Sequence, residues 1–359
     1  MAREYGVAIV GAGNIAAAHI DAVTRLPNAH VAGVASRTVD KARALAEKHG
    51  LKAFDSVEAA VADPSVDVVA ICTPSGAHLE PALLAIAAGK HVVVEKPIEV
   101  TSARAKQLID AADAAGVTLA TVFMSRFADA NAFVKRNVDE GRLGRLVQGD
   151  AYVKWFRDQA YYDSGAWRGT VRLDGGGALM NQAIHQVDLL LWVMGPVREV
   201  FAYADTLTHE RLEVEDTLVA VLRYENGALG QLSAATSLWP GRPKALHVHG
   251  ADGAAIIEDD VLIDWRTRAG GDAERQEVLA RFGPAGAGGT GGSADPMAIS
   301  FENHRRQYED LFEALDTGRP PAIDGREGIR SVELIEAIYR SVRERRPVEV
   351  GGVPGAEPR

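Results

Sequence analysis

Lys96 stands at the end of an apolar run, residues 91–94, and is followed by Pro97. Short apolar runs of this kind are typical of parallel strands buried on both faces, and open α/β sheets bind ligands beyond the carboxyl ends of their strands. A lysine at such a position can give or take the proton of a substrate hydroxyl when its surroundings lower its pKa. Pro97 restricts the backbone of Lys96 to non-helical geometry. We therefore predict an acid–base role for Lys96, although a lone lysine at a strand end usually reaches for solvent.

A second set of candidates follows the glycine triplet at residues 175–177. Asn181 and His185 are four residues apart, and His185 and Asp188 are three apart, so one face of a helix can carry all three side chains. The imidazole of His185 is a candidate acid–base partner or substrate hydrogen-bonding group. The amide of Asn181 cannot ionise, which limits it to hydrogen bonding. We expect Asp188 to be a buried partner that orients His185 or a backbone group.

Residues 11–16, with the sequence GAGNIA, follow a short apolar run and open a helix-like segment. In that context Gly11 permits a tight turn, Gly13 lets the backbone approach a pyrophosphate, and Ala16 is small enough for close helix–strand packing. The phosphates of a dinucleotide would lie at the positive end of the helix that begins at Asn14. The alternative is a glycine-rich turn that binds no ligand.

The residues after the second predicted strand, residues 31–35, indicate whether the cofactor is NAD or NADP. Dinucleotide sites usually carry an acidic residue here that binds the ribose 2′-hydroxyl. This chain has Ser36 and Arg37 instead, and residues 33–38 hold no carboxylate. A guanidinium can pair bidentately with a 2′-phosphate, so the sequence favours NADP over NAD. Arg37 could also stack on the adenine or point into water.

An aromatic and arginine-rich stretch precedes the glycine triplet and comprises Trp155, Phe156, Arg157, Tyr161, Tyr162, Trp167 and Arg168. Aromatic faces stack on sugar C–H surfaces, and arginine or tyrosine tips bind hydroxyls or a carboxylate. Arg157 and Arg168 would suit a uronate or a nucleotide-linked sugar. Arg126 is a further pocket candidate. Trp155 and Phe156 fit equally well into the core of a strand.

Residues 1–123 alternate apolar runs with alanine-rich helical stretches, which predicts βαβ units and a doubly wound parallel sheet. The predicted strands are Gly6–Val10, Val31–Ala35, Val66–Ile71, His91–Val94 and Val117–Val122. The predicted helices are Asn14–Leu26, Val39–His49, Ser102–Ala115 and one from Pro74, with Thr73 as its N-cap, to about Ala88. We assign this region as a nucleotide-binding Rossmann domain.

Residues 124–359 show long alternating segments, so we predict an α+β domain with a large, mostly antiparallel open sheet of about six strands. These strands are Leu146–Phe156, Glu199–Thr206, Asp216–Tyr224, Gly230–Ser237, Ala245–His249 and Ala254–Glu258. The predicted helices are Ala128–Glu140, Ala178–Met194, Phe301–Leu315 and Gly328–Glu344. We expect this domain to bind the substrate, and we expect the glycine-rich residues 283–294 to form a flexible loop.

Composition limits the possible partners. The 359 residues include 39 Lys+Arg and 49 Asp+Glu, and the resulting net charge of −10 argues against nucleic-acid binding. A single cysteine, Cys72, excludes an intrachain disulfide and any multi-cysteine metal centre, and we expect no metal. The sequence shows no signal-peptide pattern and no apolar segment long enough for a bilayer, so we expect a cytoplasmic protein that does not bind membranes.

Three motifs together resemble the Gfo/Idh/MocA family of nicotinamide-dependent oxidoreductases: GAGNIA at residues 11–16, VVVEKP at 92–97 and GGGALMNQAIHQVD at 175–188. The resemblance implies a Rossmann domain, a second α/β domain whose open sheet mediates dimers or tetramers, and hydride transfer at a sugar or cyclitol carbon. It implies that Lys96 is the catalytic lysine and His185 the helix histidine. Many relatives have aspartate where this chain has Asn181, which puts a proton relay through that position in doubt.

The resemblance and the motifs lead to a set of expected site residues. For the cofactor, NAD(P)(H), these are Gly11, Ala12, Gly13, Asn14, Ile15, Ser36, Arg37, Thr73, Pro74, His78, Glu95, Lys96, Trp167 and Arg168. For the substrate they are Lys96, Arg126, Arg157, Tyr162, Asn181 and His185.

The sequence thus predicts an NAD(P)-dependent dehydrogenase or reductase that acts on a CH–OH group of a sugar, sugar acid or cyclitol, with Lys96 as the acid–base group and His185 assisting. Two alternatives stay open. One is a glycosidase-type enzyme that oxidises its substrate transiently with tightly held nicotinamide. The other is a non-enzymatic sensor in which the dinucleotide sets affinity for a protein partner.

Overall fold

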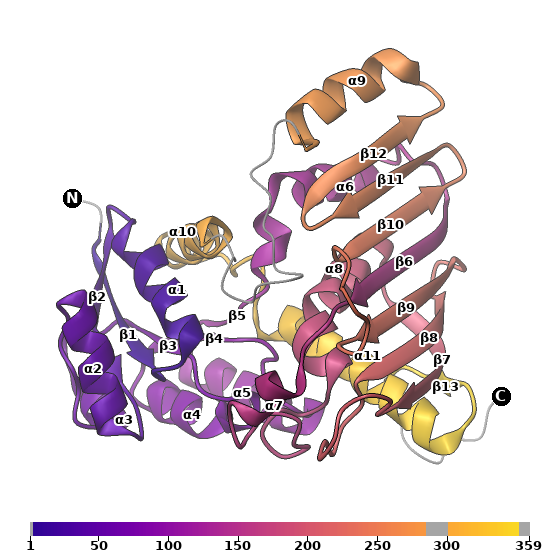
Figure 1. Ribbon diagram of the computed structural model, residues 1–359. Coiled ribbons are helices and arrows are strands. Elements are labelled where there is room, and N and C mark those ends of the chain that lie inside the picture. Colours follow the sequence, from indigo (N-terminus) through magenta and orange to yellow (C-terminus); the bar gives the residue numbers. More distant parts are fainter. Residues whose placement is uncertain (1–2, 285–300, 352–359) are drawn as a thin grey trace. The chain divides into compact units, whose positions relative to one another are not determined.

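The computed structural model describes residues 3–284 and 301–351, so most of the predicted flexible loop at 283–294 lies outside the described residues. The described chain forms two units. The first unit comprises residues 3–124, 172–175 and 301–332, and the second comprises residues 125–171, 176–284 and 333–351. Figure 1 shows the order of the elements along the chain.

A five-stranded parallel sheet, ordered β2-β1-β3-β4-β5, forms the centre of the first unit. Its strands are β1 (Tyr5–Val10), β2 (Ala29–Ala35), β3 (Val68–Ile71), β4 (His91–Val94) and β5 (Leu119–Thr121). Strands β1 and β3 are buried along their whole length because both faces of the sheet are covered. The predicted doubly wound fold is confirmed.

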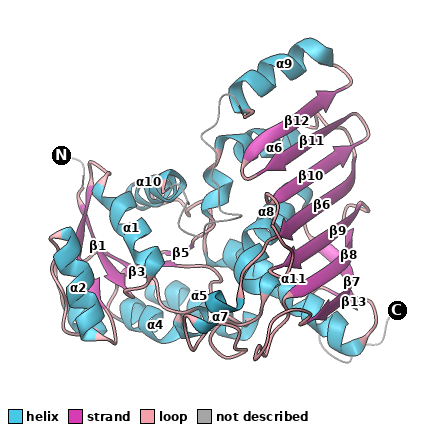
Figure 2. Cartoon of the chain, viewed as in Figure 1, coloured by secondary structure: helices cyan, strands magenta, loops and turns pink. Residues whose placement is uncertain are grey.

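Helices cover both faces of this sheet, with α1 and α10 on one side and α4 and α5 on the other (Figure 2). The helices of the first unit are α1 (Asn14–Thr24), α2 (Val39–His49), α3 (Val57–Ala62), α4 (Leu79–Ala87), α5 (Ser102–Ala115) and α10 (Glu302–Thr317). The side-chain oxygens of Ser56 and Thr101 cap the N-termini of α3 and α5.

Helix α10 packs in the first unit, whereas the sequence assignment gave all residues after 123 to the second domain. Tyr308, Leu311 and Phe312 of α10 are buried in the same core as β1. The rings of Phe312 and Tyr5 stack with their centroids 4.7 Å apart. The amphipathic pattern of α10 predicts a buried face but does not say which sheet covers it, so the sequence could not place this helix.

The second unit is built on an eight-stranded sheet with the order β12-β11-β10-β6-β9-β8-β7-β13. Its strands are β6 (Leu146–Lys154), β7 (Val197–Asp205), β8 (Thr217–Tyr224), β9 (Leu229–Ala235), β10 (Ala245–Gly250), β11 (Gly253–Glu258), β12 (Val261–Thr267) and β13 (Val348–Glu349). Only β6 and β9 pair in parallel. All six predicted strands are present, and β12 and β13 were missed.

Alternation along β8 shows that this sheet has one covered face. Leu218, Ala220 and Leu222 are buried, whereas Val219 and Val221, which point to the other face, are 50% and 56% exposed. The helices of this unit are α6 (Asp129–Asp139), α7 (Gln159–Asp163), α8 (Ile184–Met194), α9 (Gly271–Phe282) and α11 (Gly325–Glu344), the last of which begins in the first unit. No helix within the described ranges has both the length and the apolar character required to cross a membrane.

Candidate active site

The loop between β1 and α1 has the geometry of a phosphate-binding turn. Gly11 has a φ of +118°, and a Cβ there would lie 2.4 Å from the carbonyl oxygen of Cys72, so the position requires glycine. Gly13 is the N-cap of α1, where no side chain caps the helix, and a Cβ on it would meet nothing within 4 Å. The open space beside Gly13 and the uncapped N-terminus of α1 fit the pyrophosphate of a dinucleotide. Ala12 lies in this loop, and Asn14 and Ile15 are the first two residues of α1.

Ser36 and Arg37 follow directly after β2 at the same edge of the parallel sheet. The hydroxyl oxygen of Ser36 accepts the backbone N–H of Thr38 at 3.2 Å, which shapes the turn. The Arg37 side chain is exposed. Its guanidinium is therefore accessible to a phosphate or to an adenine ring.

Thr73, Pro74 and His78 lie beyond the end of β3. The predicted helix from Pro74 is interrupted, because a 3₁₀ turn, η1 (Ser75–Ala77), precedes α4. The hydroxyl of Thr73 donates to the carbonyl oxygen of Ala77 at 2.8 Å and caps no helix N-terminus, so the predicted N-cap role was wrong.

Buried His78 connects the ends of two strands. Its Nδ1 lies 2.9 Å from the carbonyl oxygen of Pro97, and its Nε2 lies 3.0 Å from the carbonyl oxygen of Thr73. The loop after β3 and the turn after β4 are thereby held together. Among the expected cofactor residues, His78 thus has a clear structural function as well.

Lys96 is half-buried immediately after β4, between two anchored carboxylates. Its backbone N–H donates to Oε2 of Glu95 at 3.0 Å. Glu99 is fully buried, accepts the backbone N–H of Leu79 at 3.0 Å and pairs with Arg104. The Lys96–Pro97 peptide bond is cis. The backbone around Lys96 is therefore held on both sides by buried polar contacts.

One group of buried side chains in the described part of the chain has the composition of a metal site. One ligand atom from each of His19, Glu95 and His304 lies within 4.8 Å of the others. In the structure, however, Nε2 of His19 is 2.9 Å from Oε1 of Glu95, a hydrogen-bond distance. Our expectation that the protein binds no metal stays a prediction.

The glycine triplet in the second unit begins an unusual helix. Residues Ala178–Ala183 (η3) form a π-helical turn that continues into α8, whereas the sequence predicted one regular helix. A Cβ on Gly177 would lie 1.7 Å from the carbonyl oxygen of Glu215. The Glu215 carboxylate accepts the backbone N–H groups of Gly177 and Leu179 at 3.1 and 2.9 Å. Single π-helical turns occur often at functional sites.

Asn181 lies on this π-helical turn and His185 on the first turn of α8, and both side chains are half-buried. The neighbouring Gln182 donates from Nε2 to the hydroxyl oxygen of Tyr161 at 2.8 Å. The structure therefore brings the helix candidates next to the aromatic stretch.

Tyr161 connects the aromatic and arginine-rich residues, a role that our site prediction missed. Its hydroxyl oxygen also accepts a hydrogen bond from Nη1 of Arg168 at 2.6 Å. The Arg168 guanidinium stacks on the rings of Tyr161 and Trp167, at 4.2 and 4.6 Å from their centroids. The guanidinium of Arg157 lies 5.0 Å from the ring of Trp155. The Arg157 guanidinium also lies 5.7 Å from the ring centroid of Tyr161, so Arg157, Trp167 and Arg168 form one cation–π cluster around Tyr161 in the second unit.

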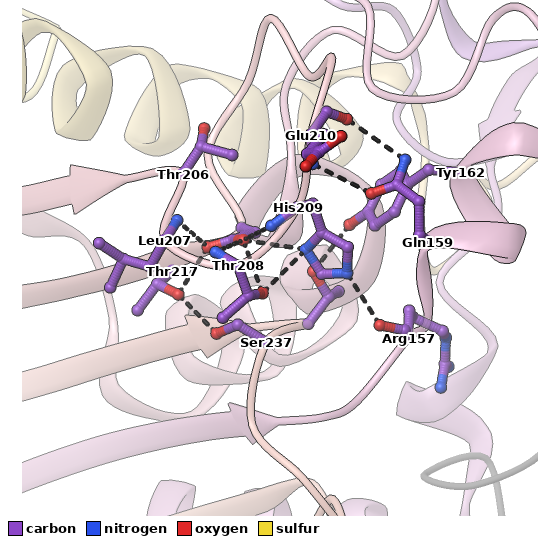
Figure 3. Close-up of polar contacts among 12 residues, drawn as sticks. Arg157, Gln159, Tyr162, Thr206, Leu207, Thr208, His209, Glu210, Thr217 and Ser237 are labelled. Atoms are coloured by element: carbon purple, nitrogen blue, oxygen red, sulfur yellow. Dashed lines mark hydrogen bonds and ion pairs between the residues drawn. The ribbon is translucent and has the colours of Figure 1, made fainter.

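Figure 3 shows the polar contacts of the loop at residues 206–210, including the one between His209 and Arg157. The Asp216 carboxylate accepts the backbone N–H groups of Leu207 and Thr208, each at 2.9 Å, and lies 2.9 Å from Nδ1 of His209. Burial alone would raise the pKa of Asp216, but these hydrogen bonds hold it well below its usual range. Nε2 of His209 lies 2.8 Å from the carbonyl oxygen of Arg157. Asp216 therefore anchors the backbone of a predicted substrate residue.

Two of the predicted substrate residues, Arg126 and Tyr162, make buried contacts with other side chains of the protein. Arg126 forms a buried bidentate ion pair with Asp188, which we expected to orient His185 or a backbone group. Tyr162 is buried, and its hydroxyl is 2.7 Å from that of Thr236. The sequence could not show these contacts, because the partners are 62 and 74 residues apart.

A phosphate-binding loop and a half-buried lysine at one edge of a parallel sheet are characteristic of oxidoreductases that bind a nicotinamide dinucleotide. The chain belongs to the GFO/IDH/MocA family. Residues 5–123 match the family model for "oxidoreductase family, NAD-binding Rossmann fold", and residues 131–256 match the GFO/IDH/MocA C-terminal domain. The predicted family and enzyme class are confirmed.

Relatives with named activities match nearly the whole chain. The WlbA dehydrogenase of Bordetella pertussis, solved with NADH and UDP-GlcNAcA, is 31% identical, with a TM-score of 0.87 over 98% of this chain and 99% of that one. The D-glucoside 3-dehydrogenase of Escherichia coli is 30% identical over 96% of this chain and 97% of its own length. The myo-inositol 2-dehydrogenase of Thermotoga maritima is 27% identical over 97% and 99%.

Proposed function

We propose that this protein is an NAD(P)-dependent dehydrogenase or reductase that acts on a CH–OH group of a sugar, sugar acid or cyclitol. The observation that carries the proposal is the position of Lys96, half-buried at the carboxyl end of β4 on the sheet whose first loop fits a dinucleotide. The names of the relatives support the substrate class. Two relatives are named as dehydrogenases of inositol and of a glucoside, and the third was solved with a nucleotide-linked sugar.

In this mechanism the Lys96 amine takes the hydroxyl proton during oxidation and returns it during reduction. A nicotinamide dinucleotide, when bound, would supply the hydride chemistry. His185 orients the substrate hydroxyl or exchanges its proton, and Asn181 contributes hydrogen bonds only. The loop from Gly11 to Gly13 and the first residues of α1, Asn14 and Ile15, would hold the pyrophosphate of the dinucleotide.

The aromatic and arginine-rich cluster supports a substrate that carries a negative charge. Trp167 and Tyr161 offer ring faces next to the half-buried Arg168 guanidinium. A pyranose ring can stack on such faces while a carboxylate or phosphate pairs with a guanidinium. We therefore favour a uronate or a nucleotide-linked sugar over an uncharged cyclitol.

The open face of the second sheet supports a homo-oligomer. Tyr203, Val219, Val221 and Leu229 are each at least half exposed, and Tyr203 and Val219 are directly paired across β7 and β8. Contiguous exposed apolar side chains on a sheet are typical of protein interfaces. We propose that a second copy of this chain covers this face, in a homodimer or a homotetramer.

A fluorescence titration of NADH and NADPH, followed by a panel of polyols, aldoses, inositols, uronates and nucleotide-linked sugars, tests the proposal. Lys96→Ala should bind the cofactor nearly as tightly as the parent chain and lose at least about 10²-fold in turnover. Lys106→Ala, which removes an exposed lysine of α5, is the matched control and should keep full turnover. Undiminished turnover in Lys96→Ala would refute the role of this lysine.

Two results would favour the alternative functions. Tightly held cofactor that is not consumed while a glycosidic bond is cleaved would indicate the glycosidase-type reaction. A chain that binds NADH, is inert to the whole panel and holds a protein partner would indicate a sensor.

A further inference from the structure

We propose that Tyr308, His19 and His304 are positioning residues of the reaction, acting through the buried Glu95 carboxylate on the backbone of Lys96. The inference rests on the acid–base role proposed for Lys96. All five residues belong to the first unit. They come from α1, the end of β4 and α10, three elements that are far apart in the sequence.

A continuous hydrogen-bonded chain connects α10 to Lys96. The hydroxyl of Tyr308 lies 2.7 Å from Nδ1 of His19, and Nε2 of His19 lies 2.9 Å from Oε1 of Glu95. The second carboxylate oxygen, Oε2, accepts the backbone N–H of Lys96 at 3.0 Å. His19 is fully buried, and Tyr308 and Glu95 are 3% and 6% exposed. Solvent therefore offers these groups no alternative partners.

Protonation states give each hydrogen bond a direction. Burial alone would raise the pKa of Glu95, but the imidazoles of His19 and His304 hold that pKa well below its usual range. The Glu95 carboxylate is therefore ionised, and Nε2–H of His19 donates a hydrogen bond to it. Burial lowers the pKa of His19, so Nδ1 of the neutral ring is an acceptor. Burial raises the pKa of Tyr308 well above its ordinary value, so its O–H is available to donate to Nδ1.

His304 approaches the same carboxylate from α10. Its Nε2 lies 3.8 Å from Oε1 of Glu95, and its ring meets that of His19 edge-on with centroids 5.6 Å apart. Glu95 is thus held from two sides. His19 lies on α1, the helix that begins at the glycine loop. The hydrogen bonds of His19 therefore also connect this helix to the turn that carries Lys96.

A purely structural role would not require these polar side chains. Val93, Ala120, Val122 and Leu311 line one part of the small cavity at His19, and His304, Gln307 and Tyr308 line the rest. A buried carboxylate is costly unless it is paired, and packed apolar side chains often stabilise a core at least as well. What the carboxylate adds is a directed bond to the backbone of Lys96, and small displacements of a reacting group reduce rates strongly.

Tyr308→Phe removes one hydroxyl of the chain and leaves the ring in place. We expect kcat with the best panel substrate to fall about tenfold and the pH profile of kcat to shift, with the NADH dissociation constant changed less than about twofold. Tyr5→Phe is the matched control. The Tyr5 hydroxyl also makes a 2.7 Å hydrogen bond, to Asp316, and it lies in the same unit but does not belong to the hydrogen-bonded series from Tyr308 to Lys96. Equal kcat and equal pH profiles in the two variants would overturn the inference.

Substitution of His19 adds a rescue test. His19→Gln retains an N–H donor for Glu95 and should keep several-fold more kcat than His19→Leu, which removes it. If His19→Leu does not fold, the comparison of Tyr308→Phe with Tyr5→Phe decides the question. Loss of activity on EDTA treatment with recovery on Zn²⁺ addition would identify the cluster as a metal site and overturn the inference.

The failure of this inference is distinguishable from the failure of the proposed function. Full turnover by Lys96→Ala would remove the role of Lys96 and the positioning role with it. An inactive Lys96→Ala together with a Tyr308→Phe that behaves like Tyr5→Phe would leave the proposed function intact and refute only the positioning role.

Discussion

Arg126 and Asp188 form a bidentate ion pair in the second unit, with Nε 2.8 Å from Oδ2 and Nη2 2.6 Å from Oδ1. Both side chains are almost fully buried, and the guanidinium also lies 5.4 Å from the ring centroid of Trp192. Asp188 is one helical turn from His185 on α8. The pair therefore fixes the segment that carries His185 to the chain that follows Met124.

Removal of one partner of this pair should be costly. Arg126→Leu leaves the Asp188 carboxylate buried without its cation, and we expect the free energy of unfolding to fall by about 3–5 kcal/mol in urea titrations. The double variant Arg126→Leu/Asp188→Leu should recover most of that loss because no charge stays buried. If the single variant is as stable as the parent, the pair carries no such constraint.

Acidification should destabilise the first unit through His19. Its pKa is lowered in the folded state, so below the unfolded-state value of about 6.5 the unfolded chain binds a proton that the folded chain does not. Stability is therefore fully present above that pH and falls as the pH decreases, by about 1.4 kcal/mol per pH unit for one proton. Urea midpoints at pH 8 and pH 5.5 measure this loss.

Two histidine variants isolate that effect. His19→Gln should make the dependence of stability on pH less steep, because one titrating group is gone while His78, whose pKa burial also lowers, remains. His49→Gln, which removes an exposed histidine at the end of α2, should leave the dependence as it is in the parent chain. A pH dependence that is unchanged in His19→Gln would assign the destabilisation to other groups.

The open face of the second sheet gives a prediction about oligomeric state. Val219 is 50% exposed at the centre of the apolar patch on β8, so Val219→Glu places a charge in the proposed interface. Sedimentation should show an oligomer for the parent chain and a smaller species for the variant. Leu84→Glu, at a 40% exposed leucine of α4, should sediment like the parent chain. A monomeric parent chain would contradict the proposed homo-oligomer.

Local sequence patterns were sufficient to predict where the locally built elements of the candidate site lie in the fold. The glycine loop at residues 11–13 and the apolar run before Lys96 each lie within one βαβ unit, where the chain direction fixes the edge of the sheet. The alternating runs likewise predicted six strands of the second sheet. Strand β12 was missed; its burial departs from strict alternation, because the consecutive residues Val261 and Leu262 are both buried.

Contacts between distant residues could not be predicted in the same way. The bonds from Glu215 to Gly177, from Asp216 to His209 and from His19 to Glu95 all depend on which elements pack together. A hydrophobic pattern indicates that a face is buried but not what covers it. The sequence offered one signal for these contacts, the adjacent carboxylates Glu215 and Asp216 directly before an alternating strand. Acidic residues are rarely buried unless they are paired, so two of them beside a buried strand indicate hydrogen-bond partners elsewhere in the fold.

Cofactor preference gives the last prediction. Arg37 is exposed after β2, and residues 33–38 contain no carboxylate that would repel a 2′-phosphate. A hydrogen bond to a charged group contributes about 1.5–3 kcal/mol, so Arg37→Ala should weaken NADPH binding at least about tenfold and leave NADH binding within about twofold. The control is Arg43→Ala, which removes an exposed arginine of α2 and should change neither affinity. The WlbA relative was solved with NADH. If the parent chain binds NADH more tightly than NADPH and Arg37→Ala changes neither affinity, Arg37 does not select the cofactor.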